Sequence, residues 1–140
     1  LRLVREQARS ALHAPPAAPR RLSQAEVFAA REAVLDLRFA PELERYLVEL
    51  VLASRDARRY DATLARRIAW GASPRGSIAL ERCARARAWL AGRDYVTPED
   101  IHAIAPDVLR HRVLPSYEDT AEGWDSGRLV AELLQRVPLP

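Results

Sequence analysis

The chain has 140 residues, enough for one domain or for one domain with an arm. A hydrophobic content of 49% and a charged content of 29% exclude a disordered chain. No apolar run approaches the ~20 residues that a membrane-spanning helix needs. The net charge is +3, but the 19 acidic residues are spread among the 22 basic ones, so the composition permits nucleic-acid binding without indicating it. The single cysteine excludes an internal disulfide and fits a reducing compartment, which predicts a cytoplasmic protein with no membrane partner.

The first twenty residues differ from the rest of the chain. Residues 1–13 have a helical pattern, and three prolines within 15–19 predict its end and a stiff linker. The chain begins at Leu1 without an initiator methionine, which we interpret as a segment of a longer protein. We therefore expect residues 1–20 to be an arm and residues 21–140 to be the domain.

Two helices are predicted at the start of this domain. Ser23 and Glu26 have the spacing of a capping box and open the first helix. Pro41 breaks that helix, and a second helix is expected over 42–55. Apolar residues recur at helical spacing in both. The two stripes are Val27, Ala30, Val34 and Leu37 in the first helix, and Leu43, Leu47, Leu50 and Val51 in the second.

The segment Gly71-Ala72-Ser73-Pro74-Arg75 opens the longest predicted helix. Ser73 is a good N-cap, and Pro74 suits the first helical position because its missing N–H costs nothing there. Arg75 then lies near the positive end of the helix dipole, where a cation is disfavoured. An anion such as phosphate bound at the same place would explain the arginine. The alternative is a solvated arginine with a small electrostatic penalty.

This helix is expected to run to residue 91, where Gly92 ends it. Before it, residues 56–72 are irregular, with a short helix predicted over 62–70. Cys83 is expected to be a small buried residue, and Arg82 and Arg85 are expected to point away from the apolar stripe. That stripe consists of Ala79, Cys83, Ala86 and Leu90, widened by Leu80 and Ala84.

Two further helices complete an all-α fold. The first begins at Thr97-Pro98-Glu99-Asp100, an N-cap followed by proline and two acids, and Pro106 is expected to kink or divide it. The last covers 125–137 and carries five apolar residues at helical spacing. Only short extended pieces are predicted, at 94–96 and 112–114. The stripe of the first of these helices is Ile101, Ile104, Ala105, Val108 and Leu109.

Three segments in order carry a family resemblance: residues 71–75 (GASPR), 92–101 (GRDYVTPEDI) and 105–113 (APDVLRHRV). Together they closely resemble the C-terminal helical lid domain of MoxR-type AAA+ ATPases. The similarity covers roughly residues 20–140, so it implies an all-α lid-domain bundle. A lone Ser-Pro-Arg would have no such specificity.

The resemblance implies that Arg75 is the sensor 2 residue, which reaches the nucleotide phosphates from the lid. A guanidinium can bond phosphate oxygens in a bidentate way and offset the charge that develops during phosphoryl transfer. The implied nucleotide-binding segment is Gly71, Ala72, Ser73, Pro74 and Arg75. Gly71 and Ala72 are expected to let the loop approach the nucleotide or the protein core closely, although a simple turn is an equal alternative.

The same resemblance implies cofactors and partners that this chain does not hold by itself. The sequence has no lysine, hence no Gly-x-x-x-x-Gly-Lys-Ser/Thr loop, and no apolar strand ends in Asp-Glu. ATP and magnesium would therefore be held mainly by a missing N-terminal AAA+ core, and this chain alone should not hydrolyse ATP. The implied partners are neighbouring subunits of a ring, typically a hexamer, and a client protein, for which a von Willebrand-type domain is one option.

Other candidate residues carry less chemistry. Trp70 is a candidate for stacking on adenine, with packing in the core as the alternative. His111 lacks a positioned acid or nucleophile, and the three histidines lack metal-site spacing, so we expect no metal bound by this domain. Arg93, Asp94 and Tyr95 are expected to fix a turn. Tyr117 and Trp124 are expected to anchor the last helix, or else to contact a neighbouring subunit.

Two functions compete with the lid interpretation. One is a non-enzymatic helical module that binds a protein partner. The other is an arginine-rich nucleic-acid-binding domain, motivated by the sequence pI of about 9.6 and the basic residues within 55–67. Neither accounts for the ordered match of the three segments.

Overall fold

A computed structural model describes residues 21–140 of the chain. The predicted helix over 1–13, the proline linker and the arm over 1–20 lie outside the described residues. The chain divides into two compact units, residues 1–30 and residues 31–140. The boundary expected between residues 20 and 21 stays a prediction.

The helix α2 (Gln24–Leu35) begins as the sequence predicts. The Ser23 N–H donates to the Glu26 carboxylate at 2.8 Å, and the Glu26 N–H donates to the Ser23 hydroxyl at 3.2 Å, which is the reciprocal capping box. The expected apolar stripe is not a buried face, since no residue of α2 is buried. Leu37, the last residue of that stripe, is buried, but it follows the end of the helix.

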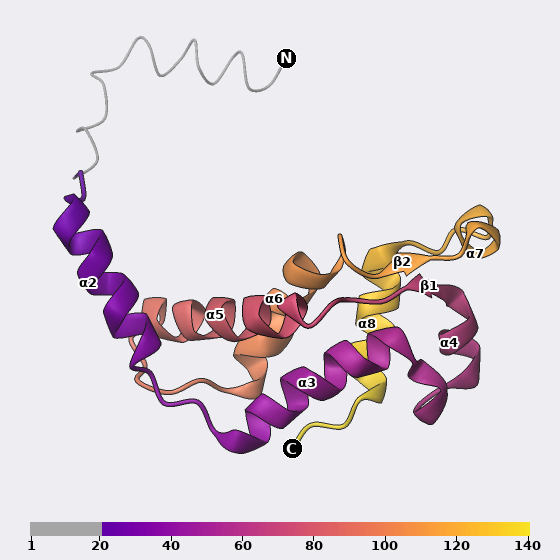
Figure 1. The fold of residues 1–140 in the computed structure, drawn as a ribbon, viewed down its shortest axis with the longest axis horizontal. Helices are drawn as coiled ribbons and strands as arrows, with labels where there is room; N and C mark the ends of the chain where they lie inside the picture. Colours follow the sequence, from indigo (N-terminus) through magenta and orange to yellow (C-terminus); the bar gives the residue numbers. More distant parts are fainter. Residues whose placement is uncertain (1–20) are drawn as a thin grey trace, which may run out of the picture. The chain divides into compact units, whose positions relative to one another are not determined.

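The second unit is built from helices and one small sheet, which confirms the all-α fold class (Figure 1). Within residues 21–140, the sheet consists of two short antiparallel strands. In chain order the elements are α3 (Pro41–Arg55), the 3₁₀ helix η1 (Ala57–Arg59), α4 (Ala62–Arg67), β1 (Ile68–Trp70), α5 (Arg75–Leu90), α6 (Pro98–Leu109), β2 (Leu114–Pro115), α7 (Tyr117–Ala121) and α8 (Ser126–Arg136).

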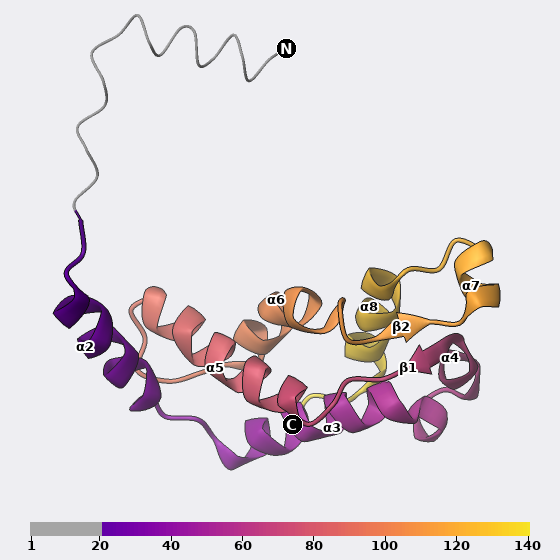
Figure 2. The same cartoon turned by 45° about the horizontal axis from the view of Figure 1, so that its top comes forward.

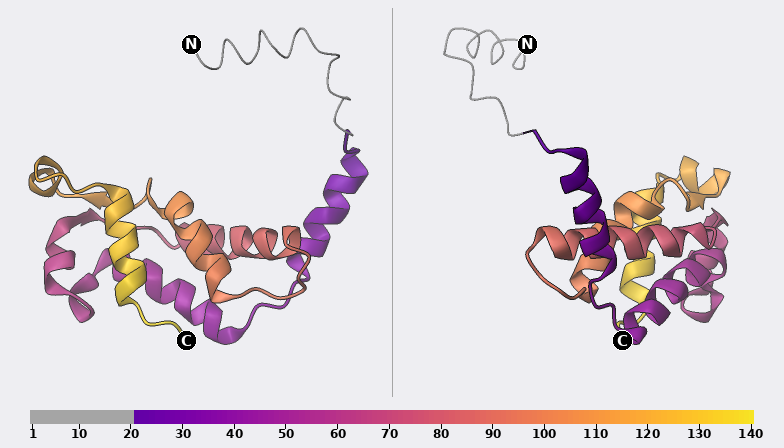
Figure 3. Two further views of the ribbon diagram at one scale, coloured as in Figure 1. Left: turned by 180° about the vertical axis from the view of Figure 1, so that it is seen from behind. Right: turned by 60° about the vertical axis from the view of Figure 1, so that its left-hand side comes forward.

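The core of this unit lies among α3, α5, α6 and α8. Helix α3 packs against α5 and α8, and α6 packs against α5 and α8 (Figures 1 and 3). The predicted apolar faces of α3, α6 and α8 are buried in this core, as their helical periodicity indicates. The largest side chains that are fully buried include Leu50, Leu80, Ile101, Leu109, Leu129 and Leu133.

Helix α5 buries only part of the predicted stripe. Leu80 and Ala84, which widened the stripe, are buried together with Ala88, whereas Cys83 is exposed and Leu90 is 78% exposed. The centre of the stripe was misplaced because alanines occur on several sides of this helix, so the apolar pattern does not select one face. Its end is as predicted, because Gly92 has φ +73° and the N–H of Arg93 donates to the carbonyl of Ala88 at 3.0 Å.

Arg85 also departs from the prediction that it points away from the core. Its side chain is 13% exposed, and its guanidinium carbon lies 5.1 Å from the centre of the Phe39 ring. The guanidinium donates to the backbone carbonyls of Leu35, at 3.2 Å, and Leu37. An arginine that lines the apolar face can therefore satisfy the backbone of the segment between α2 and α3.

Helix α6 is continuous from Pro98 to Leu109, so Pro106 does not divide it. The extended piece expected over 94–96 is present. The N–H of Arg38 donates to the Asp94 carbonyl at 2.9 Å, and the N–H of Val96 donates to the Arg38 carbonyl at 3.1 Å. These two bonds hold the segment before α6 against the segment before α3.

The irregular region is partly strand. The helix expected over 62–70 ends at Arg67, and Ile68–Trp70 pairs with Leu114–Pro115 as β1 and β2 (Figure 2). A three-residue strand is too short to show a period of two, so its pairing partner is decided by the tertiary fold. Helix α7 was not predicted from the sequence.

Candidate functional site

The loop between β1 and α5 is held tightly against the end of α3. The N–H of Ala72 donates to the Ser54 hydroxyl at 2.9 Å, and that hydroxyl donates to the Val51 carbonyl at 2.6 Å. A Cβ at Gly71 would lie 2.3 Å from the carbonyl oxygen of Ser54, so only glycine permits this approach. The structure therefore shows that Gly71 brings the loop close to the protein core, one of the alternatives left open by the sequence.

A second close approach fixes the first turn of α5. Gly76 is buried, and a Cβ there would lie 3.3 Å from the Ala72 side chain and 3.5 Å from a methyl group of Val51. Ala72 is itself only 1% exposed, whereas Ser73, Pro74 and Arg75 are exposed. The segment is therefore anchored on both sides of an exposed stretch of three residues.

The N-terminus of α5 is not capped by Ser73, which corrects that part of the prediction. Pro74 is at the N-cap position with helical angles (φ −54°, ψ −23°), and no side chain makes a capping hydrogen bond there. The N–H of Gly76 donates to the Ser73 carbonyl at 2.7 Å, and the N–H of Ser77 donates to the Pro74 carbonyl at 3.1 Å. The backbone thus satisfies its own donors in a tight turn, and no hydroxyl acceptor is needed.

Arg75 is exposed at the start of this helix. It belongs to a small group of arginines whose side chains make no hydrogen bond, ion pair or ring contact within residues 21–140; the others are Arg21, Arg55 and Arg82. Because two N–H groups of the first turn are already used, the guanidinium of Arg75 is the strongest anion-binding group on this loop.

The other predicted site residues are scattered. Trp70 is 73% exposed, so the expectation that it packs in the core is wrong, and stacking on adenine stays a prediction. Tyr117 is 90% exposed and does not anchor α8. Trp124 does, since the guanidinium carbon of Arg128 in α8 lies 3.7 Å from its ring centre and that of Arg67 lies 4.1 Å away. His111 is exposed, with no acid partner among residues 21–140.

A buried ion pair at the start of α6 was missed by sequence reasoning. Asp100 is 2% exposed and accepts two bonds from the Arg93 guanidinium, at 2.6 and 2.7 Å, and one from the Thr97 N–H at 3.0 Å. Burial favours the neutral acid, but the Arg93 guanidinium and the Thr97 N–H outweigh it and hold the pKa of Asp100 below its usual value. Arg93 therefore fixes the turn, as expected, through a partner that the sequence did not reveal.

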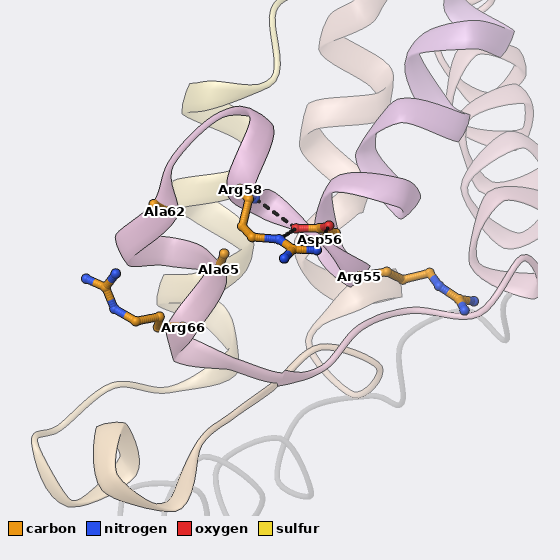
Figure 4. A pocket seen from close by; sticks show the side chains of 6 residues that line it. All are labelled: Arg55, Asp56, Arg58, Ala62, Ala65 and Arg66. Atoms are coloured by element: carbon orange, nitrogen blue, oxygen red, sulfur yellow. Dashed lines mark hydrogen bonds and ion pairs between the residues drawn. The ribbon is translucent and has the colours of Figure 1, made fainter.

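A surface pocket of about 420 Å³ lies where α3, η1 and α4 meet (Figure 4). Asp56 accepts two bonds from the Arg58 guanidinium, at 2.8 and 2.5 Å, and these bonds with the Arg58 N–H lower the pKa of Asp56 to about 2. The Asp56 carboxylate in this pocket is thus ionised, and its charge is already paired with that of Arg58. The pocket is lined by Arg55, Asp56, Arg58, Ala62, Ala65 and Arg66.

The part of the chain that the structure describes has neither a metal-binding cluster nor a helix that could span a membrane. No group of three or more His, Cys, Asp and Glu side chains in this part of the chain is placed to hold a metal ion. None of the described helices is long and apolar enough to cross a lipid bilayer.

Comparison with known proteins places these features in a family. Residues 61–133 match the AAA lid domain family. "Chaperone MoxR1" of Mycobacterium tuberculosis is 34% identical over 127 residues, which cover 90% of this chain and 34% of that protein. "Protein MoxR" of Methylorubrum extorquens is 60% identical over 50 residues, which cover 34% of this chain and 15% of that protein.

A further relative and a solved structure agree with this. The chloroplastic "Magnesium-chelatase subunit ChlI" of Nicotiana tabacum is 51% identical over 63 residues, covering 45% of this chain and 14% of that protein. The crystal structure of a "putative ATPase" from Cytophaga hutchinsonii superposes with a TM-score of 0.82 at 37% identity, covering 85% of this chain and 36% of that chain.

The chain spans about a third of the length of the relatives that it matches over most of its own length. The family match includes the loop that carries Arg75 and the turn that carries Arg93 and Asp100. The chain therefore belongs to the AAA lid domain family, and it is the helical lid region of a MoxR-type AAA+ ATPase.

Proposed function

We propose that this lid senses the nucleotide state of an ATP-hydrolysing protein through Arg75, in the role of sensor 2. The observation that carries the proposal is the state of that arginine. It is exposed, makes no interaction within residues 21–140, and lies on a loop that is anchored to α3 on both sides. A guanidinium in this state can bind phosphate oxygens without first breaking an internal ion pair.

The residues around Arg75 suit this role because they fix its position. Gly71 and Ala72 attach the loop to the end of α3, and Ser73 and Pro74 form the tight turn before the arginine. When phosphate binds the guanidinium, the loop and α3 follow it. Nucleotide occupancy is thereby converted into a position of the lid.

The whole protein would supply the remaining chemistry. ATP and magnesium would be held by an N-terminal AAA+ core, with magnesium neutralising phosphate charge during hydrolysis. The protein would work in the cytoplasm as a ring, typically a hexamer. Its activity would be chaperone-like maturation or remodelling of a client, one option being a client with a von Willebrand-type domain. The name "Chaperone MoxR1", printed for the M. tuberculosis relative, supports the chaperone-like part of this proposal.

A nucleic-acid partner is not proposed, because much of the basic charge is used inside the domain. Several arginines are paired with carboxylates on different helices. The pairs include Arg67 with Asp119, Arg93 with Asp100 and Arg136 with Asp61. Such pairs leave less free positive charge for a phosphate backbone.

The test is magnesium-dependent ATP turnover by the full-length protein and its Arg75→Ala variant. We expect turnover to fall about a hundredfold, since removing one preorganised donor from a developing charge commonly has an effect of this size. The matched control is Arg82→Ala, which removes an exposed arginine without partners from the same helix and should leave turnover unchanged.

Two results would contradict the proposal. Equal turnover in the wild type and the Arg75→Ala variant would make Arg75 a solvated surface residue. No ATPase activity in the wild-type protein would favour the non-enzymatic interaction module instead. The exposed pair of Trp70 and Leu114, which lie opposite each other on β1 and β2, is the surface that supports that second function.

A further inference from the structure

A second arginine without partners lies beside the loop that carries Arg75. Arg55 is the last residue of α3, is exposed, and makes no side-chain hydrogen bond, ion pair or ring contact within residues 21–140. Carboxylates close to it in sequence are used by other groups. Asp56 pairs with Arg58, and Glu49 accepts from the Tyr60 hydroxyl at 2.7 Å. The Arg55 guanidinium therefore has no carboxylate partner within residues 21–140.

The backbone of Arg55 is in contact with the loop itself. A Cβ at Gly71 would lie 2.7 Å from the Cα of Arg55, so the two backbones touch at this point. Gly71 and Arg75 are then only four chain steps of about 3.8 Å apart. At the other end of the same contact, Gly76 packs on Val51, one helical turn before Arg55. Arg55 and Arg75 therefore both lie next to the junction at which the end of α3 contacts the loop and the first turn of α5.

The direction of the Arg55 side chain agrees with this placement. Although Arg55 borders the surface pocket, Figure 4 shows its side chain extending away from Arg58 and Arg66 and out of that pocket. The guanidinium is consequently separate from the Asp56–Arg58 pair. Arg55 thus lines the edge of the pocket, while its guanidinium points away from the pocket's ion pair.

Neither of these two arginines has a carboxylate partner within residues 21–140, and Asp56, the acid next to Arg55, is bonded to Arg58. The sequence from Gly71 through Leu80 contains no aspartate or glutamate. Two guanidinium groups on a fixed backbone are a suitable arrangement for a ligand with several adjacent anionic oxygens, because each group can bond two of them. A polyphosphate has this chemistry, whereas a single carboxylate can occupy only one of the two guanidinium groups in bidentate fashion.

We propose that Arg55 is a second phosphate-binding residue, which acts with Arg75 on the same nucleoside triphosphate. This inference rests on the proposed nucleotide-sensing function of Arg75. It adds that the end of α3, and not only the start of α5, takes part in recognising the phosphates. The lid would then grip the polyphosphate from both helices of the junction, and loss of the terminal phosphate would release both.

The test measures binding of ATP and of AMP to the full-length protein by titration calorimetry at fixed salt. Arg55→Ala should weaken ATP binding about tenfold, and should weaken AMP binding much less because AMP has a single phosphate. Arg55→Lys should recover part of the loss, since it restores the charge without the bidentate geometry. Arg82→Ala is the matched control and should bind ATP like the wild type.

The variants separate failure of this inference from failure of the proposed function. Unchanged ATP affinity in Arg55→Ala, with a loss in Arg75→Ala, would overturn the inference and leave the function of Arg75 intact. Unchanged affinity in both variants, together with equal ATP turnover in the wild type and Arg75→Ala, would overturn both. An equal loss for ATP and AMP in Arg55→Ala would also overturn the inference, because Arg55 would then not contact the phosphate chain.

Discussion

The starts of α5 and α6 have similar sequences but differ in their capping and in whether their charged side chains are paired. Each has a hydroxyl residue followed by proline, Ser73-Pro74 in one and Thr97-Pro98 in the other. At α6 the carboxylate of Asp100 accepts bonds from the Thr97 N–H and from Arg93, so the charges in this turn are paired. At α5 no side chain caps the helix, and the arginine in its first turn has no partner within residues 21–140.

This difference separates a helix start whose charges are paired within the fold, at α6, from one whose arginine has no partner within residues 21–140, at α5. A buried, paired charge stabilises one conformation, and removing either partner leaves the other uncompensated. An exposed arginine near the positive end of a helix dipole contributes little to stability. Under the proposed function, a bound phosphate explains the helix start of the second kind, whereas the first kind is explained by the fold alone.

The largest effect on stability is expected for Asp100→Asn. Asparagine keeps the size of the side chain but removes the charge that Arg93 pairs with, so the free energy of unfolding should fall by about 3–5 kcal/mol. The measurement is urea unfolding followed by circular dichroism. Asp107→Asn is the matched control, because Asp107 is on the same helix, its side chain is 75% exposed, and its pair with Arg110 is at the surface.

The pH dependence provides a second check on Asp100. Its pKa is lower in the folded state than in the unfolded chain, so its contribution to stability is present above the unfolded pKa of about 3.9. That contribution is lost as the pH falls through the folded value. The difference in stability between the wild type and Asp100→Asn should therefore be constant near neutral pH and shrink below about pH 4. A difference that does not change with pH would contradict the ionised pair.

A smaller loss is expected for Gly71→Ala. The added methyl group would lie 2.3 Å from the Ser54 carbonyl oxygen, so the backbone must move, at a cost of about 1–3 kcal/mol. Ser73→Ala is the matched control for the same loop and should change stability by less than about 0.5 kcal/mol, since Ser73 makes no cap. A loss of about 1 kcal/mol in that control would mean that Ser73 does cap α5.

The smallest effect on stability is expected for Arg75→Ala. Because the side chain is exposed and has no partner within residues 21–140, the free energy of unfolding should change by no more than about 0.5 kcal/mol. Thermal unfolding in the absence of nucleotide measures it. A clear loss of stability would show that Arg75 supports the fold, and the contrast between the two helix starts would disappear.

The sequence predicted the parts of the fold that have strong periodicity. In α3, α6 and α8 most of the large aliphatic residues recur at helical spacing along one face, so the buried face follows from spacing, although Val48 and Leu52 of α3 are exposed. For α5, Leu80 and Ala84 were correctly included in the buried stripe, but its centre was misplaced, because a buried alanine such as Ala88 cannot be distinguished from alanines on other faces. The expectation that Trp70 packs in the core also failed. Trp70 lies on a strand that pairs with residues more than forty positions later, and that pairing leaves its side chain exposed.

The site was predicted only in part for a similar reason. The order of residues 71–75 indicated an unusual helix start and an arginine that needs an explanation. The Ser73 cap was wrong because a local preference was overridden by a tight backbone turn. The pairing of Arg93 with Asp100 and the contact of Gly71 with Ser54 join residues that spacing alone does not relate.

The Ser54 hydroxyl connects the loop before α5 directly to the last turn of α3. It accepts a hydrogen bond from the Ala72 N–H and donates one to the Val51 carbonyl. Because Gly71 has no side chain, the backbone of the loop lies directly against the backbone of α3. Under the proposed function, a phosphate bound to Arg75 would therefore be coupled to α3 through this contact. Because α3 packs on α8, the coupling would extend to the last helix of the chain (Figure 3).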